Sequence, residues 1–244
     1  MSTRLFIILF MQYHHIHFDI IDSTNTYLKN SYRLLNNFTF ASASYQSHGK
    51  GRNERIWQSK KGDNLLFSLL LKEKKYMDYA SKMSLFMAVE IAQILQLYGI
   101  KNVSIKWPND VYVNNKKICG ILTESQIPDY LVIGVGLNVN QKEFPDGLRS
   151  LPTSMCLESK KTYDIDELKI ELFGQIINSF NNVKVEKYLE YFIEHNYLLE
   201  KRVKVTINNQ DFIGEVVGID HNFCLKIVTR DMLLHVDSGE ITIL

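Results

Sequence analysis

The stretch from Lys106 to Asp110, Lys-Trp-Pro-Asn-Asp, constrains the fold most, because it places a tight polar turn between two apolar runs. Proline fixes φ, and asparagine and aspartate bond to their own backbone, so the stretch predicts a turn between strands. Lys117 follows seven residues after Asp110, and Gly-Ile-Leu follows at 120–122. Such turns also occur for purely structural reasons. A functional interpretation therefore needs a second, independent motif.

That second motif is a basic loop at residues 46–57, with the sequence Gln-Ser-His-Gly-Lys-Gly-Arg-Asn-Glu-Arg-Ile-Trp. Its glycines let the backbone approach a ligand closely, and its cations donate hydrogen bonds to phosphate or carboxylate groups. These residues are Gly49, Gly51, Lys50, Arg52 and Arg55. The loop does not fit the Walker A pattern, so a nucleotide site here must be of another kind. The structural alternative is a solvated basic loop with incidental glycines.

Composition limits the class of protein. A chain of 244 residues with 45% hydrophobic and 23% charged residues is typical of a soluble globular protein with one large domain, or with a main domain and a small appendage. The net charge of +1 argues against a general nucleic-acid surface. Three widely spaced cysteines (Cys119, Cys156 and Cys224) without a CxxC pair indicate neither disulfides nor zinc, and predict a cytoplasmic location.

Two N-terminal features predict neither a membrane segment nor a metal site. The apolar run at residues 5–11 is too short to span a bilayer and lacks a small-residue cleavage pattern after it, so we interpret it as a leader into the first strand or a poorly ordered tail, not as a signal peptide. Histidines at positions 14, 15 and 17 lie on a predicted strand, where alternating side chains point to opposite faces. We therefore expect them to bind no metal.

Hydrophobic periodicity predicts an α+β chain. The predicted strands are residues 14–21, 38–45, 64–71, 103–107, 111–113, 117–124 and 131–139. The predicted helices are residues 77–98, 165–180 and 185–195, together with a helix that begins at a cap on Asp22 or Ser23 and carries Tyr27, Leu28, Leu34 and Leu35. The pair Asn114-Asn115 tolerates the positive φ of a tight hairpin, and Gly99 ends a helix.

The periodicity changes near residue 199. Short strands then dominate, with turns at 208–209, 220–222 and 238–239, which predicts a small β-barrel. We therefore expect a main domain at residues 1–197 and a small C-terminal β-barrel domain at residues 198–244. The expected architecture is a mixed, mostly antiparallel sheet with helices on one face, followed by that barrel.

Five motifs occur in order along the chain. They are Asp-Ser-Thr-Asn at 22–25, the Gly-Lys-Gly-Arg loop ending in Trp57, the Lys-Trp-Pro-Asn-Asp turn, Lys117 before Gly-Ile-Leu, and Gly-Val-Gly-Leu-Asn at 134–138. Together they resemble the biotin protein ligases over nearly the whole chain. The resemblance implies a class II synthetase-like catalytic domain and a reaction in two steps. Biotin and MgATP form biotinyl-5′-AMP and pyrophosphate, and a lysine of a biotin carboxyl carrier protein, or of a biotin-dependent carboxylase subunit, then attacks the adenylate.

The resemblance also assigns roles to residues. It implies biotin contacts from Ser23, Thr24, Asn25, Gln46, Gly49, Lys50, Trp57, Lys117, Gly120, Leu122, Gly134 and Gly136. It implies ATP or adenylate contacts from Lys50, Arg52, Arg55, Trp57, Trp107, Asn109, Lys117 and Asn138. The implied catalytic residues are Lys117, Arg52 and Asp110, and Asp110 holds magnesium. Lys50 replaces the usual first arginine of the loop, and Glu54 stands where glycine is common, so the geometry of this contact is open.

Each assignment has a structural alternative. Residues 23–25 suit a helix N-cap, the two tryptophans suit a core, and the glycines suit tight strand packing. Lys106 and Lys116 are rivals to Lys117 on sequence alone. The related lipoate ligases and octanoyltransferases are the enzymatic alternative. Because the first motif begins at Asp22, we expect no helix-turn-helix domain ahead of it and no specific DNA binding, with the protein a monomer or homodimer.

Overall fold

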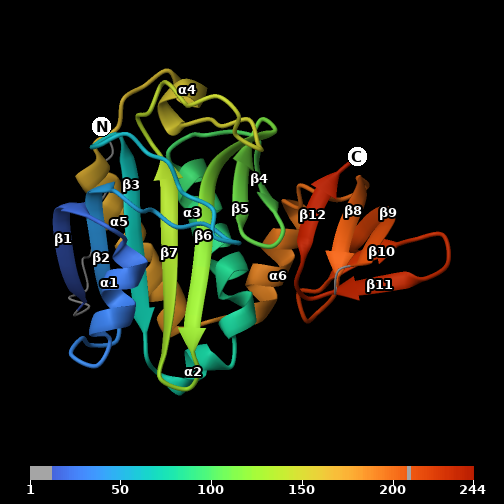
Figure 1. Ribbon diagram of the computed structural model, residues 1–244, viewed down its shortest axis with the longest axis horizontal. Coiled ribbons are helices and arrows are strands. Elements are labelled where there is room, and N and C mark those ends of the chain that lie inside the picture. The colour runs from blue at the N-terminus through green and yellow to red at the C-terminus, as the bar shows by residue number, and fades with distance from the viewer. Residues whose placement is uncertain (1–12, 208–209) are drawn as a thin grey trace, which may run out of the picture.

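The computed structural model describes residues 13–207 and 210–244. The predicted leader at 5–11 and the predicted turn at 208–209 lie outside the described residues. A seven-stranded sheet forms the main domain, and only its β1–β2 pair is parallel. Its order is β1 (His14–Ile21), β2 (Thr39–Gln46), β3 (Asn64–Leu71), β7 (Tyr130–Asn138), β6 (Lys116–Gln126), β5 (Asp110–Val113) and β4 (Val103–Lys106). The mixed, mostly antiparallel sheet expected from the sequence is confirmed (Figure 1).

Helices cover both faces of this sheet, where the sequence predicted one. α3 (Met83–Leu97), α5 (Ile165–Asn181) and α6 (Val185–Glu194) cover the larger core, while α1 (Thr24–Ser31) covers the other face. Successive side chains of β2 point to opposite faces of the sheet, which explains this arrangement. Phe40 stacks on Phe173 of α5 with ring centroids 4.0 Å apart, and its neighbour Ala41 packs beside Leu28 of α1. The prediction of helices on one face is wrong for α1 alone.

Helix boundaries differ modestly from the predictions. The predicted helix at 77–98 is divided into α2 (Lys74–Met77), a 3₁₀ turn η1 (Ala80–Lys82) and α3. α1 ends at Ser31, so Leu34 is exposed rather than helical. A short helix, α4 (Met155–Ser159), interrupts the loop after Pro152. The hairpin at Asn114 and Asn115 is confirmed, with φ of 49° and 63°.

A second, five-stranded antiparallel sheet follows the helices. Its strands are β8 (Arg202–Ile207), β9 (Gln210–Ile219), β10 (Leu225–Val228), β11 (Leu233–Val236) and β12 (Glu240–Ile243), in the order β11-β10-β9-β8-β12. The strand order leaves β11 and β12 at the two edges of the sheet. The C-terminal strands thus form an open sheet where the sequence predicted a small barrel.

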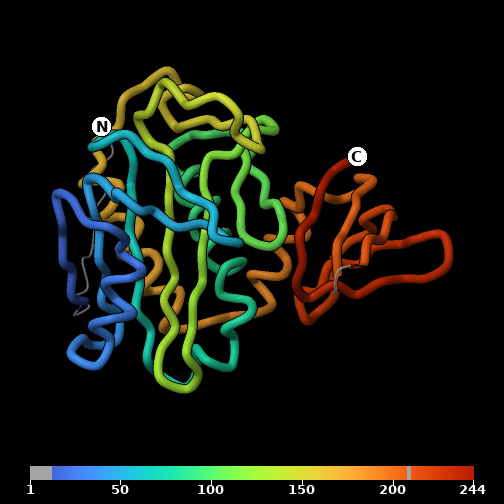
Figure 2. The backbone as a smooth tube through the Cα atoms, viewed as in Figure 1, coloured from blue at the N-terminus to red at the C-terminus, as the bar shows by residue number. Residues whose placement is uncertain are grey.

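The small sheet packs beside the main domain near α6 and β5 (Figure 2). Its buried side chains join the main core, where Phe223 packs edge-on against Phe86 of α3 with ring centroids 5.4 Å apart. The Trp107 indole N–H also donates to the Phe223 carbonyl at 3.1 Å. These contacts connect the Lys-Trp-Pro-Asn-Asp turn directly to the C-terminal sheet.

Candidate active site

A cavity of about 700 Å³ opens between the main sheet, the basic loop and strand β12. The structure brings 17 of the 18 predicted site residues to its wall. These are Ser23, Thr24, Asn25, Gln46, Lys50, Arg52, Arg55, Trp57, Trp107, Asn109, Asp110, Lys117, Gly120, Leu122, Gly134, Gly136 and Asn138. Among the described residues, Gly49 is the predicted residue that the wall does not include.

The basic loop folds back on itself as a small hairpin. Gly51 N–H donates to Arg55 O at 2.7 Å, and Trp57 N–H donates to Gly49 O at 2.8 Å. A Cβ on Gly49 would lie 2.7 Å from the Trp57 carbonyl oxygen. Gly49 therefore lets the loop close on itself, and its contact with a ligand stays a prediction. Glu54, where glycine was expected, has a left-handed φ of 58°.

The glycines of β6 and β7 make room for protein side chains. A Cβ on Gly136 would lie 2.4 Å from Trp57 Cε2, and a Cβ on Gly120 would lie 2.7 Å from Trp57 Cζ3. A Cβ on Gly134 would lie 2.2 Å from Asn25 Oδ1. The space beside these glycines is therefore occupied by Trp57 and Asn25 in this structure. The Trp57 Nε1 donor is buried without a hydrogen-bond partner among the described residues.

One end of the cavity is polar and buried. Ser23 caps α1, with its hydroxyl accepting from Thr26 N–H, so the cap predicted from the sequence is confirmed. Gln46 Oε1 accepts from Thr24 N–H at 2.8 Å. Ser68 of β3 has no exposed surface, and its hydroxyl lies 2.6 Å from Thr24 Oγ1. Ser68 was not among the predicted site residues, although it is the one polar residue within the Leu-rich strand that follows Asn64.

Two consecutive hairpins bring the predicted catalytic pair together. Asp110 begins β5 opposite Gly120, and Lys117 lies opposite Tyr112, with a register shift between Val111 and Tyr112. The Lys117 ammonium lies 2.7 Å from Asp110 Oδ1 as an ion pair, without the angular geometry of a hydrogen bond. An ammonium has three N–H donors, and this ion pair does not engage them in a well-aligned hydrogen bond. The donors are therefore available to a second anion.

Asn109 ties the turn to its surroundings. Its Nδ2 donates to Ile121 O at 2.7 Å, and its Oδ1 accepts from Arg52 at 3.3 Å. Asn109 therefore links β6 to the basic loop.

The cavity wall carries an excess of positive charge. Six cations face two carboxylates, namely Lys50, Arg52, Arg55, Lys106, Lys117 and Arg149 against Asp110 and Glu240. Burial lowers the pKa of Arg52, with Arg55 acting in the same direction and Asp110 opposing it. Burial likewise lowers the pKa of Lys106. Cations that are held partly out of water without matching anions favour an anionic ligand such as a triphosphate.

The C-terminal sheet fastens the basic loop. Arg52 donates to Gly239 O at 3.1 Å, and Arg55 pairs with Glu240 Oε1 at 2.5 Å. Arg149, from the loop before α4, pairs with the same carboxylate oxygen. Arg149 and Glu240 were not predicted, because no local pattern connects Glu240 with Arg149, 91 positions away, or with Arg55, 185 positions away.

Two predicted ligand contacts also have structural roles. Trp107 reaches the cavity wall, but its side chain is only 2% exposed and its N–H is bonded to Phe223 O. Asn138 donates through Nδ2 to Thr153 O at 2.9 Å, while its Oδ1 is buried without a hydrogen-bond partner among the described residues. Asn138 therefore has a free acceptor, whereas Trp107 chiefly joins the two sheets.

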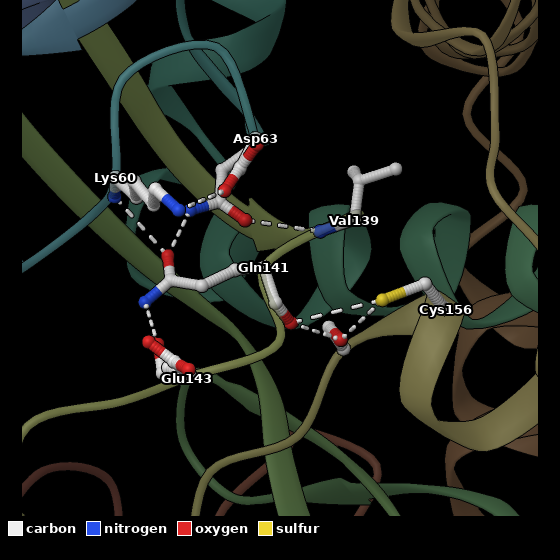
Figure 3. A network of polar contacts seen from close by, with 8 residues as sticks. Lys60, Asp63, Val139, Gln141, Glu143 and Cys156 are labelled. Atoms are coloured by element: carbon white, nitrogen blue, oxygen red, sulfur yellow. Dashed lines mark hydrogen bonds and ion pairs between the residues drawn. The ribbon is translucent and has the colours of Figure 1, made fainter.

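A polar network anchors the far end of the loop. Gln141 Oε1 accepts from Lys60 N–H at 3.2 Å, and Gln141 Nε2 donates to Glu143 O at 2.9 Å (Figure 3). The Gln141 carbonyl accepts from Cys156 Sγ at 3.8 Å. Lys60 also lies 3.8 Å from Asp63. The network thus fixes the chain just after the basic loop, while residues 50–53, 55 and 56 of the loop border the cavity.

The residues fit a magnesium ion that arrives with a nucleotide. No three His, Cys, Asp or Glu side chains cluster as a metal site within the described residues, and this includes the three histidines of β1. Asp110 supplies one carboxylate at the cavity wall. Magnesium commonly uses one or two carboxylates together with substrate phosphates. No described helix is long and apolar enough to cross a membrane.

Comparison with known proteins agrees with this geometry. Residues 17–138 match the model of the biotin/lipoate A/B protein ligase family, and the chain belongs to that family. It is 29% identical to the bifunctional ligase/repressor BirA of Bacillus spizizenii, over 95% of this chain and 74% of that protein. It is 29% identical to biotin–protein ligase 2 of Arabidopsis thaliana, over 62% of this chain and 45% of that one. The structure of the biotin protein ligase from Aquifex aeolicus in complex with biotin and ATP superimposes with a TM-score of 0.84 at 27% identity, covering 95% of this chain and 98% of that chain.

Proposed function

We propose that this protein joins biotin to a lysine of an acceptor protein, with ATP as the energy source and biotinyl-5′-AMP as the intermediate. Membership of the ligase family and similarity to biotin protein ligases support this activity. The finer choice is between biotin and lipoate, because the family name includes both.

The buried polar end of the cavity favours biotin. Thr24, Asn25 and Ser68 place hydroxyl and amide groups where almost no solvent reaches. The ureido ring of biotin offers N–H donors and a carbonyl acceptor to such groups. The dithiolane ring of lipoate offers neither, so it gives these groups no hydrogen bond beyond those they make with one another, whereas biotin adds some. This arrangement is the observation that carries the proposal.

The cationic part of the cavity suits the nucleotide. In the first step, the biotin carboxylate attacks the α-phosphorus of ATP, a P–O bond forms, and pyrophosphate leaves with the electron pair of the bond that breaks. Negative charge grows on the attacking and leaving oxygens, and fixed cations at Lys117 and Lys106 stabilise it. Magnesium, delivered with ATP and held near Asp110, supplies further charge neutralisation.

In the second step, a lysine amine of the acceptor attacks the acyl carbon, and AMP leaves. The mixed anhydride must be protected from water until then. The basic loop is well suited to this, because Trp57 covers the glycines of β6 and β7 and Arg52 can grip the phosphate. We assign Arg52 to retention of the intermediate rather than to bond making.

Partner and setting complete the proposal. The acceptor is a biotin carboxyl carrier protein or a biotin-dependent carboxylase subunit, and the ligase works as a monomer or homodimer without binding specific DNA. The three free thiols, Cys119, Cys156 and Cys224, support a reducing, cytoplasmic location.

Mass spectrometry of the acceptor tests the activity. The protein, MgATP and a purified carrier domain are incubated with biotin or with lipoate. We expect one lysine of the carrier to gain the mass of a biotinyl group, and a carrier whose acceptor lysine is changed to arginine to gain nothing. A carrier that gains lipoyl but no biotinyl groups would contradict the proposed substrate.

A further inference from the structure

Behind the polar end of the cavity, Glu124 of β6 terminates a chain of hydrogen bonds. Its Oε2 accepts from Asn25 Nδ2 at 2.8 Å, and its Oε1 pairs with the ammonium of Lys29. Asn25 lines the cavity, whereas Glu124 is not among the described residues of the wall. The chain continues from Asn25 through Ser68 to Thr24, which also line the cavity. Glu124 can therefore influence a ligand only through its neighbours.

The orientation of the Asn25 amide follows from its partners. Nδ2 faces two acceptors, the Glu124 carboxylate and the Leu122 carbonyl, the latter at 3.4 Å. Oδ1 therefore faces Ser68, which donates to it at 2.5 Å. Gly134 has no Cβ, and an added one would lie 2.2 Å from Asn25 Oδ1, so the amide is held closely.

The single proton of each hydroxyl group then fixes the direction of the whole chain. Ser68 uses its only proton on Asn25, so the 2.6 Å contact between Ser68 and Thr24 requires Thr24 to donate. Gln46 Oε1, 3.0 Å from Thr24 Oγ1, is a second acceptor for the Thr24 proton, but the contact with Ser68 is shorter at 2.6 Å. We assign the proton to Ser68, and Gln46 Oε1 accepts from Thr24 N–H at 2.8 Å. All three side-chain donors point toward the carboxylate. The oxygen of Thr24, which lines the cavity, then accepts no hydrogen bond from these partners, so its lone pairs are available to a ligand.

Glu124 is charged under ordinary conditions. Burial raises the pKa of its carboxyl, but hydrogen bonds from Lys29 and Asn25 outweigh burial and bring the pKa below its usual range. A carboxylate only accepts hydrogen bonds, so the Asn25 amide directs its Nδ2 donor, and not its oxygen, toward Glu124.

We propose that Glu124 is a positioning residue for ligand recognition: through Asn25 and Ser68 it sets Thr24 to accept a hydrogen bond from an N–H group of the ligand. The inference rests on the proposed function, in which that group belongs to the ureido ring of biotin. In this arrangement Thr24 contacts the ligand, and Glu124 sets the direction in which the Thr24 hydroxyl donates its proton.

The substitution Glu124→Gln tests this proposal. A glutamine can donate to Asn25 Oδ1, so the chain can reverse and present a Thr24 proton to the ligand N–H. We expect the dissociation constant for biotin, measured by calorimetry, to rise about tenfold, the effect of losing one hydrogen bond. The dissociation constant for ATP should stay the same. Lys29→Met, which retains the carboxylate, should change biotin binding by no more than about twofold.

A double-mutant cycle separates positioning from general disruption. Thr24→Val removes the hydroxyl that accepts the hydrogen bond from the ligand. In that background Glu124→Gln should therefore cause no further loss of biotin affinity. Losses that add, or an unchanged affinity in Glu124→Gln alone, would overturn the inference. If thermal melting shows Glu124→Gln unfolded, Ser68→Ala serves instead, because it disconnects Thr24 from Glu124 and should give the same pattern. Failure of the unmodified protein to bind biotin would overturn the proposed function, and this inference with it.

Discussion

The ammonium of Lys117 lies 2.7 Å from Oδ1 of Asp110, and this ion pair joins two neighbouring strands at the cavity wall. Both side chains remain partly exposed, at 26% and 17%. The pair holds the ammonium at the cavity wall without enclosing it, which suits the charge-stabilising role that we propose for Lys117.

Replacement of Lys117 by alanine should lower the rate of biotinyl-AMP formation by on the order of a hundredfold or more, because a fixed cation is lost from the transition state. Lys116→Ala is the matched control, since Lys116 pairs with Glu158 outside this cavity. Single-turnover formation of the adenylate measures both variants, and circular dichroism checks the fold. An unchanged rate in Lys117→Ala would remove this lysine from the site.

Arg52→Gly should still form biotinyl-AMP but release it into solution, because Arg52 reaches the cavity from a loop rather than from a rigid strand. Biotin transfer to free amines or unrelated proteins should rise. Asn53→Gly is the control for loop flexibility, because Asn53 already has a left-handed φ of 54° and both Arg52 contacts remain. Retention of the adenylate by Arg52→Gly as tightly as by the parent would contradict this role.

Glu240→Gln should loosen the basic loop, because it weakens the charge pairing with Arg55 and Arg149 that fastens the loop to β12. Hydrogen exchange of amides between residues 50 and 57 should become faster in the ligand-free protein. Asp211→Asn changes an acid of the same sheet that pairs with Lys204 instead, and should leave the loop unaffected. Equal exchange in Glu240→Gln and the parent would show that the carboxylate does not restrain the loop.

Gly136→Ala should displace Trp57, because the new Cβ would lie 2.4 Å from the indole. Tryptophan fluorescence should change and biotin affinity should fall by about tenfold or more, since the wall of the cavity is rearranged. Gly174→Ala is the control: it lies within α5 with nothing within 4 Å of the added Cβ, and it should stabilise the protein slightly. A Gly136→Ala protein with parental fluorescence would place Trp57 elsewhere.

Glu90 makes stability depend on pH. Its carboxyl is buried beneath α5 and α6, and burial raises its pKa despite hydrogen bonds from Tyr188 and Gln175. Above its unfolded-state pKa, near 4.5, the unfolded chain releases a proton that the folded chain retains, so this group's contribution to stability falls as pH rises toward the folded pKa. Relative to Glu90→Gln, the parent should therefore lose thermal stability as pH rises above about 4.5. A constant difference in melting temperature over that range would contradict the shift.

Local patterns predicted most elements of the fold. The apolar run at β3 and the asparagine pair of the β5–β6 hairpin are correct because each depends on neighbouring residues. Neighbouring residues could not predict that α1 lies on the opposite face of the sheet. Its position depends on how the side chains of β2 are divided between the two hydrophobic cores.

The sequence motifs predicted which residues line the site better than how those residues are arranged. Residues of the basic loop do reach the cavity, but its attachment to Glu240 joins segments about 185 positions apart. The role of Gly49 and the pairing of Gly136 with Trp57 depend on how the loop folds back, which composition does not specify. Ser68 was missed because a serine in a buried strand gives no signal until its partners are known.

The most direct test of the central claim is pyrophosphate release from ATP and magnesium in the presence of biotin or of lipoate, without any acceptor protein. The buried polar groups at Thr24, Asn25 and Ser68 predict release with biotin and only background release with lipoate. Release that requires lipoate and is absent with biotin would contradict the assignment of this protein as a biotin ligase.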